Sequence, residues 1–140
     1  MRLVIDTNRI IAALVKSGIS RYIILDRRFS FLTPEYTLEE FEAHLKEISN
    51  KSGLSENEIR IVADILFERI EIVPMYEYSN FIERANSIIG NVDEKDAPFI
   101  ALTLASHNDG IRSDDKHFQK QNVIKMWTTE LIIKEFFSKV

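Results

Sequence analysis

Acidic residues stand at four places in this sequence where an element of secondary structure is predicted to begin or end. They are Asp6, the pair Glu39 and Glu40, the pair Asp93 and Asp96, and the pair Asp114 and Asp115. Carboxylates about 3–5 Å apart repel one another, so a protein gathers several of them only if a cation neutralises them or one holds a proton. The commonest use of such a cluster is a divalent metal centre that activates water for phosphodiester hydrolysis.

Two of these places follow a predicted strand. Asp6 comes directly after the short apolar run Leu3–Ile5, which is typical of a buried strand in a parallel sheet. Ligands bind at the carboxyl edge of such sheets. The segment Asp-Thr-Asn also suits a turn or a helix cap, so position alone leaves Asp6 open between a cap and a metal ligand. Asp114 and Asp115 follow the predicted strand 111–113, and would share that edge with Asp6 if the two strands are neighbours.

Glu39 and Glu40 lie in the first turns of a helix that Thr33 is predicted to cap and Pro34 to open. Acids near a helix N-terminus are favoured by the helix dipole, so a purely helical role stays open for both. Helix phase favours Glu40 over Glu39 as the acid that faces a site, because it flanks Phe41 on the buried stripe.

Asp93 and Asp96 are spaced i, i+3 at the start of a helix predicted over 93–107, so their carboxylates share one face. A solvated first turn would have the same residues. The small and apolar stretch 97–102 favours a role for Asp96. That stretch must be largely buried, so the start of its helix points into the interior or into a cleft.

The composition restricts what could bind these acids. The chain has no cysteine, which excludes disulfides, zinc–thiolate sites and thiol nucleophiles. Carboxylates, hydroxyls and water best suit hard cations such as Mg²⁺ or Mn²⁺. The net charge of −4 gives no general argument for nucleic-acid binding. It does not exclude such binding either, because basic residues can line the rim of an acidic cleft.

Size and hydropathy predict one soluble domain over residues 1–140, since 45% of the residues are hydrophobic and 29% charged. We find no signal peptide and no apolar run long enough to cross a bilayer, and expect a cytoplasmic protein.

Predicted strands alternate with predicted helices along the chain. The strands are expected at 3–5, 29–32, 70–73, 111–113 and 123–127. The helices are expected from about 8 to 18, over 20–27 and 33–51, from a capping box at 55–58, over 81–90 with its end at Gly90, over 93–107, and from Thr128 or Thr129 to 137. This alternation predicts a three-layer α/β/α sandwich with a central, mostly parallel sheet.

Other chemistries find little support. Phosphatases with an aspartyl nucleophile need Asp-x-Asp after the first strand, but Asn8 occupies the second acidic position. Glycine-rich phosphate loops and the Gly-x-Ser-x-Gly motif are absent. His44, His107 and His117 do not have the spacing of metal ligands.

Taken together, the motifs resemble the PIN-domain nucleases, which include the VapC-type toxins of bacterial and archaeal toxin–antitoxin pairs. The segment Val4–Asn8 resembles the opening strand of that family and its Asp-Thr/Ser-Asn element. Glu40 and Asp96 are similar to its second and third acids. The segment Ser113–Phe118 resembles its Thr/Ser-x-Asp-x-x-Phe motif, which places Asp115 at the fourth acid.

The resemblance implies a ribonuclease that depends on Mg²⁺ or Mn²⁺, and many members of the family form homodimers. It assigns the catalytic and metal-binding roles to Asp6, Glu40, Asp96 and Asp115. Supporting roles are expected for Thr7, Asn8, Ser113, Asp93 and Asp114. The basic residues that we expect near RNA phosphates are Arg9 and Lys116, with Lys16, Arg112, His117 and Lys120 as further candidates.

The resemblance also suggests a biological setting. Toxin action on RNA, restrained by a separately encoded antitoxin protein, is the first hypothesis. An RNA-processing nuclease outside any toxin–antitoxin pair is the alternative within the family. A non-catalytic module that binds RNA or a partner protein is a second class, although the four filled acidic positions favour the enzyme. A plain Mg²⁺-dependent phosphatase would need a small closed pocket.

Overall fold

The computed structural model describes residues 1–89 and 93–137. Its five strands form one sheet in the order β3-β2-β1-β4-β5, and every pair of neighbours is parallel. They are β1 (Arg2–Ile5), β2 (Ser30–Pro34), β3 (Ile70–Val73), β4 (Ile111–Arg112) and β5 (Met126–Trp127). The prediction of a parallel central sheet is therefore confirmed. The predicted helix end at Gly90 lies outside the described residues.

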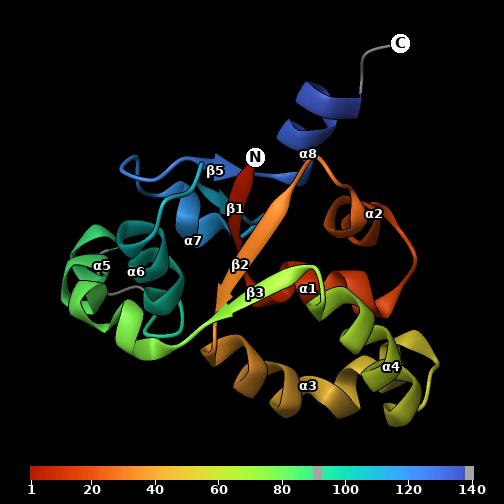
Figure 1. Ribbon diagram of the computed structural model, residues 1–140. Helices are drawn as coiled ribbons and strands as arrows, with labels where there is room; N and C mark the ends of the chain where they lie inside the picture. Colours follow the sequence, from red (N-terminus) through yellow and green to blue (C-terminus); the bar gives the residue numbers. More distant parts are fainter. Residues whose placement is uncertain (90–92, 138–140) are drawn as a thin grey trace.

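Helices cover both faces of the sheet, which confirms the three-layer α/β/α sandwich (Figure 1). One face carries α1 (Thr7–Val15), α2 (Ile19–Leu25), α3 (Tyr36–Ser52), α4 (Glu56–Phe67), α8 (Thr129–Ile132) and the π-helical turn η3 (Ile133–Phe137). The other face carries α5 (Ile82–Ile89), α6 (Ala97–Ala105) and α7 (Lys116–Gln119), after the short 3₁₀ turns η1 (Met75–Glu77) and η2 (Ser79–Phe81).

Strand β1 lies in the middle of the sheet and is buried on both faces. Leu3 and Ile5 pack into the core beneath α1–α4, whereas Val4 packs beneath α5 and α6. None of these three side chains is more than 1% exposed. This alternation follows from the two-residue period of a strand, and it explains why a strand with two covered faces is apolar throughout.

The order of the strands creates a crevice beside β1. The chain passes from β1 through β2 to β3 and then returns to β4 on the opposite side of β1. Ile5 pairs with Arg112, so the residues that follow β1 and β4 emerge side by side. Open α/β sheets bind their ligands outside the carboxyl ends of the strands at such a reversal.

The predicted helix start at Thr33 and Pro34 is wrong, because both residues belong to β2. Thr33 pairs with Ile72 of β3, and its hydroxyl donates to the Ile5 carbonyl over 2.9 Å. The residue after Pro34, Glu35, donates its amide to Val73 O over 2.9 Å. Pairing with β3 therefore extends the strand through a sequence that would suit a helix cap, and α3 begins at Tyr36.

Among residues 1–89 and 93–137, no helix combines the length and the apolar character that a bilayer crossing requires. The assignment of residues 1–140 to one domain and the cytoplasmic location stay predictions.

Candidate metal centre

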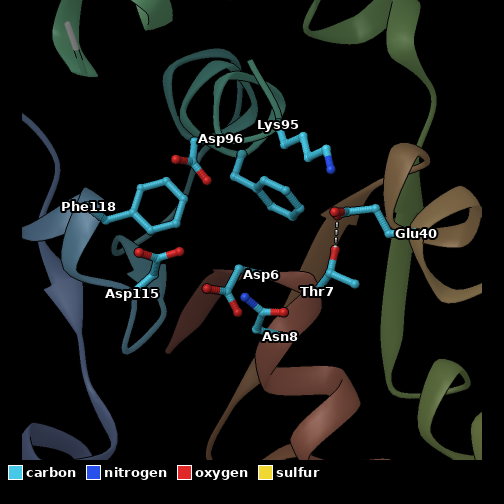
Figure 2. A pocket seen from close by; sticks show the side chains of 9 residues that line it. Asp6, Thr7, Asn8, Glu40, Lys95, Asp96, Asp115 and Phe118 are labelled. Atoms are coloured by element: carbon cyan, nitrogen blue, oxygen red, sulfur yellow. Dashed lines mark hydrogen bonds between the residues drawn. The ribbon is translucent and has the colours of Figure 1, made fainter. Parts of the chain in front are cut away.

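A small cavity of about 40 Å³ opens at the carboxyl edge of the sheet (Figure 2). The residues that line it are Asp6, Thr7, Asn8, Glu40, Lys95, Asp96, Phe99, Asp115 and Phe118. All four acids that the resemblance singles out therefore face one space, although they are up to 109 positions apart in the chain. The cavity is large enough for a cation with water. It is too small to enclose a nucleotide, because pockets that enclose ligands of drug size have volumes of about 300 Å³ or more.

Asp6 caps a helix and also lines the cavity, while its role as a metal ligand stays a prediction. One carboxylate oxygen accepts a hydrogen bond from Arg9 N over 2.9 Å and so caps α1. The other oxygen accepts the hydroxyl of Ser113. Burial raises the pKa of Asp6 to about 6, against the opposing effect of these two hydrogen bonds. The carboxylate is thus held in a place where its negative charge is poorly solvated.

Glu40 is fixed by hydroxyl groups beneath it. Thr7 Oγ1 donates to Glu40 Oε1 over 2.5 Å, as the dashed line in Figure 2 marks. The hydroxyl of the buried Thr37 lies 3.3 Å from Thr7 Oγ1 and 2.7 Å from Thr33 Oγ1, which connects the glutamate to the sheet. Burial raises the pKa of Glu40. Glu39 is exposed and is not among the residues that line the cavity.

Asp96 lies at the start of α6, which begins at Ala97 and not at the predicted position 93. Its carboxylate accepts no capping hydrogen bond from the described part of that helix, and it points into the cavity instead (Figure 2). Burial raises the pKa of Asp96, and the charge of Asp115 adds to the effect. The apolar residues of α6 are buried as expected, so the packing of this helix fixes where Asp96 stands.

Asp115 and Asp6 share a partner. The hydroxyl of Ser113 donates to Asp6 and accepts a hydrogen bond from Asp115 N over 3.0 Å. Asp115 Oδ1 in turn accepts from His117 N over 2.9 Å and caps the short helix α7, which the sequence did not predict. The supporting role of Ser113 is consistent with this geometry.

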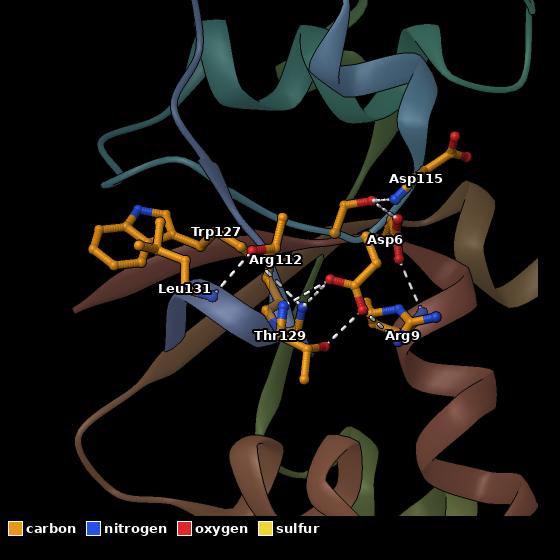
Figure 3. A network of polar contacts seen from close by, with 10 residues as sticks. Asp6, Arg9, Arg112, Asp115, Trp127, Thr129 and Leu131 are labelled. Carbon is orange, nitrogen blue, oxygen red and sulfur yellow. Dashed lines mark hydrogen bonds and ion pairs between the residues drawn. The ribbon is translucent and has the colours of Figure 1, made fainter. Parts of the chain in front are cut away.

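Asp114 does not line the cavity and belongs to a separate polar network with Arg9 and Thr129, both labelled in Figure 3. Its oxygens accept hydrogen bonds from Thr129 N and Thr129 Oγ1 over 2.7 and 2.6 Å, and from Arg9 Nη1 over 2.9 Å. Arg112 Nη1 lies 3.5 Å from its Oδ1. Burial acts to raise the pKa of Asp114, but the Thr129 bonds and the charges of Arg112 and Arg9 outweigh it and lower that pKa.

Three of the expected RNA contacts differ in their exposure. Arg112 is 1% exposed, so the expectation that it contacts RNA is wrong. Arg9 is 23% exposed and its guanidinium is bound to Asp114. Lys116 is exposed beside Asp115, and its role as a phosphate contact stays a prediction.

The loop before α6 contains one lining residue that the sequence did not single out. Lys95 is exposed and lines the cavity, so it adds a positively charged side chain to the lining residues. Asp93 accepts a hydrogen bond from Lys95 N over 2.9 Å and so stabilises a turn. It does not line the cavity, and its supporting role stays a prediction. The run Asp-Glu-Lys-Asp at 93–96 was the available signal, but it also fits a solvated first turn.

The donor atoms around the cavity suit a hard divalent cation. Asp6, Glu40 and Asp96 all have raised pKa values because they are buried, so positive charge in their midst would be favourable. Oxygen donors are the ligands that Mg²⁺ and Mn²⁺ prefer. The residues present therefore fit the predicted metal, and an acidic group that can hold a cation includes Asp96 and Asp115.

Comparison with known families gives one match. The family model described as a PIN domain matches residues 4–136, a range that contains all four acids of the cavity. No curated protein matches the chain. Members of the matched family are generally nucleases that use a divalent metal.

Proposed function

The chain belongs to the PIN-domain family, and from this premise we propose that it is a divalent-metal-dependent endoribonuclease. The observation that carries the proposal is the convergence of four carboxylates on one small cavity beside the reversal in strand order. They are Asp6, Glu40, Asp96 and Asp115. A binding module without catalysis would not need to gather four buried or half-buried acids against their mutual repulsion.

Each residue of the site has a part in this activity. The carboxylates of Asp6, Asp96, Asp115 and Glu40 would hold the metal. A bound Mg²⁺ or Mn²⁺ would lower the pKa of the attacking water and stabilise the charge on the phosphate. Lys95 at the rim attracts a phosphate group of the RNA backbone. Because the cavity does not enclose a nucleotide, the RNA strand lies across its mouth.

Two hydroxyl residues keep the acids in place. Ser113 connects Asp6 with the backbone of Asp115, and Thr7 holds Glu40. In other metal sites, removing a hydrogen-bond partner that orients a metal ligand costs about 10–100-fold in metal affinity or activity.

Within the family we propose the toxin of a VapBC-type toxin–antitoxin pair, which acts on RNA and is restrained by an antitoxin protein. The support is the resemblance of the ordered motifs, from Val4–Asn8 to Ser113–Phe118, to the PIN-domain nucleases, a family that includes the VapC-type toxins. The same resemblance is the basis for a homodimer, whereas the size of the chain is the basis for a single domain over residues 1–140. RNA processing outside such a pair is the alternative setting.

Metal-dependent RNA cleavage tests the activity. We expect the purified protein to cut single-stranded RNA with millimolar Mg²⁺ or Mn²⁺ and to stop when EDTA removes the metal. In the proposed mechanism the metal lowers the pKa of the attacking water and stabilises the charge on the phosphate. The measurement is gel analysis of a mixed panel of labelled RNAs. Metal-independent cleavage would contradict the proposal, and no cleavage of any RNA would favour the binding module.

A further inference from the structure

His117, whose spacing along the chain is not that of a metal ligand, lies against two of the four acids. His117 Nδ1 is 2.8 Å from Asp96 Oδ2 and 3.7 Å from Asp115 Oδ1. One donor atom from each of the three residues lies within 4.8 Å of the other two. Donor atoms that share a cation at about 2.1 Å stand about 3–4.2 Å apart. Side-chain adjustments of a fraction of an ångström would therefore place all three on one ion.

The backbone fixes the imidazole at this place. His117 N donates to Asp115 Oδ1 over 2.9 Å, which binds the two residues into one turn at the start of α7. The next residue, Phe118, is 1% exposed and anchors that turn in the core. The His117 side chain itself is 38% exposed, so a cation with bound water can reach it without rearrangement of the core.

The other two acids have different partners. Asp6 binds Ser113 and caps α1, and Glu40 is bound by Thr7. Among the described residues, the group of His and acidic side chains whose donors lie close enough to share a cation is Asp96, Asp115 and His117. The nitrogen donor is thus better placed toward Asp96 and Asp115 than the carboxylate of Glu40 is.

We propose that His117 is a ligand of the cation, together with Asp96 and Asp115. The inference rests on the proposed cation site and adds a nitrogen ligand to it. Imidazole suits first-row transition metals, whereas carboxylates and water alone suit Mg²⁺ equally well. The site therefore prefers Mn²⁺ to Mg²⁺, and His117 is the source of that preference.

Pulsed electron paramagnetic resonance of bound Mn²⁺ tests this directly, since it detects a nitrogen bonded to the metal. The wild-type protein with Mn²⁺ alone gives a directly coordinated ¹⁴N signal, and His117→Gln loses it. The glutamine keeps a polar side chain near Asp96. Loss of a ligand also weakens Mn²⁺ binding, measured by titration calorimetry, by about tenfold or more, and weakens Mg²⁺ binding less. His107→Gln is the matched control, because His107 is exposed and its carbonyl binds Arg2 at the opposite edge of the sheet.

Several results would overturn the proposal. One is a wild-type Mn²⁺ complex without a nitrogen signal, and another is a nitrogen signal that persists in His117→Gln. A third is equal weakening of Mg²⁺ and Mn²⁺ binding in His117→Gln, which would make His117 a hydrogen-bond partner of Asp96 only. Failure of Mn²⁺ to bind overturns it as well. RNA cleavage by the same samples separates this inference from the proposed function. Nitrogen-coordinated Mn²⁺ without cleavage would refute only the proposed nuclease activity. Cleavage without the nitrogen signal would refute only the role of His117 as a ligand.

Discussion

Replacing Asp96 by asparagine should lower the rate of RNA cleavage about a hundredfold or more, while the metal-free protein becomes no less stable. The lost carboxylate is one of the proposed cation ligands. A hundredfold effect corresponds to about 2.7 kcal/mol of transition-state stabilisation. Burial and the charge of Asp115 both raise the pKa of Asp96 in the folded protein. A raised acid pKa means that the ionised form opposes folding at neutral pH, and the neutral amide removes that cost.

The measurement pairs initial cleavage rates in Mn²⁺ with urea denaturation in EDTA. Asp64→Asn is the matched control, because Asp64 is an exposed acid on α4 that does not line the cavity. It should leave both quantities near the wild-type values. Cleavage by Asp96→Asn at the wild-type rate would refute its role in the site, and a large loss of stability would assign the lost activity to unfolding.

Replacing Asp114 by alanine should destabilise the fold by about 3 kcal/mol. Arg112 is 1% exposed, and removing the acid leaves its buried charge without that partner. Breaking a buried pair costs about 3–5 kcal/mol, and we expect the lower end because the Asp114 side chain is 32% exposed. The substitution also removes the acceptor for Thr129 N at the start of α8 (Figure 3).

A double-mutant cycle identifies the cause. Urea denaturation of Asp114→Ala, Arg112→Met and the double variant should show a double loss clearly smaller than the sum of the single losses, because the apolar side chain leaves no buried charge behind. A loss below about 1 kcal/mol in Asp114→Ala would show that water solvates Arg112 adequately.

Local signals predicted much of the fold and part of the site. Strand β1 could be recognised because a short apolar run ends in Asp6, and both faces of that strand are indeed buried. The capping box at Ser55 and Glu58 predicted the start of α4, where both of its hydrogen bonds are present. Asp96 stood out because the helix behind it is apolar enough to require burial. Each inference used residues that lie within one helical turn or one strand of one another in the sequence.

Contacts between segments that are far apart in the chain could not be predicted from the sequence. Thr33 looks like a helix cap until β3 pairs with it, since the pairing depends on a strand that begins 37 positions later. The buried Arg112 looks like a surface cation until Asp114 and Thr129 surround its guanidinium. His117 has no ligand spacing along the chain and meets Asp96 only in three dimensions. Tertiary packing decided each of these cases.

The position of a bound metal tests the central claim most directly. Crystals of the protein grown with Mn²⁺ and measured for its anomalous scattering should show a peak inside the cavity. We expect that peak about 2.2 Å from carboxylate oxygens of Asp96 and Asp115, with Asp6 on the same ion or on a second one. A peak elsewhere, or none in the cavity at a Mn²⁺ concentration that supports RNA cleavage, would contradict the assignment of this acidic cluster as the metal centre.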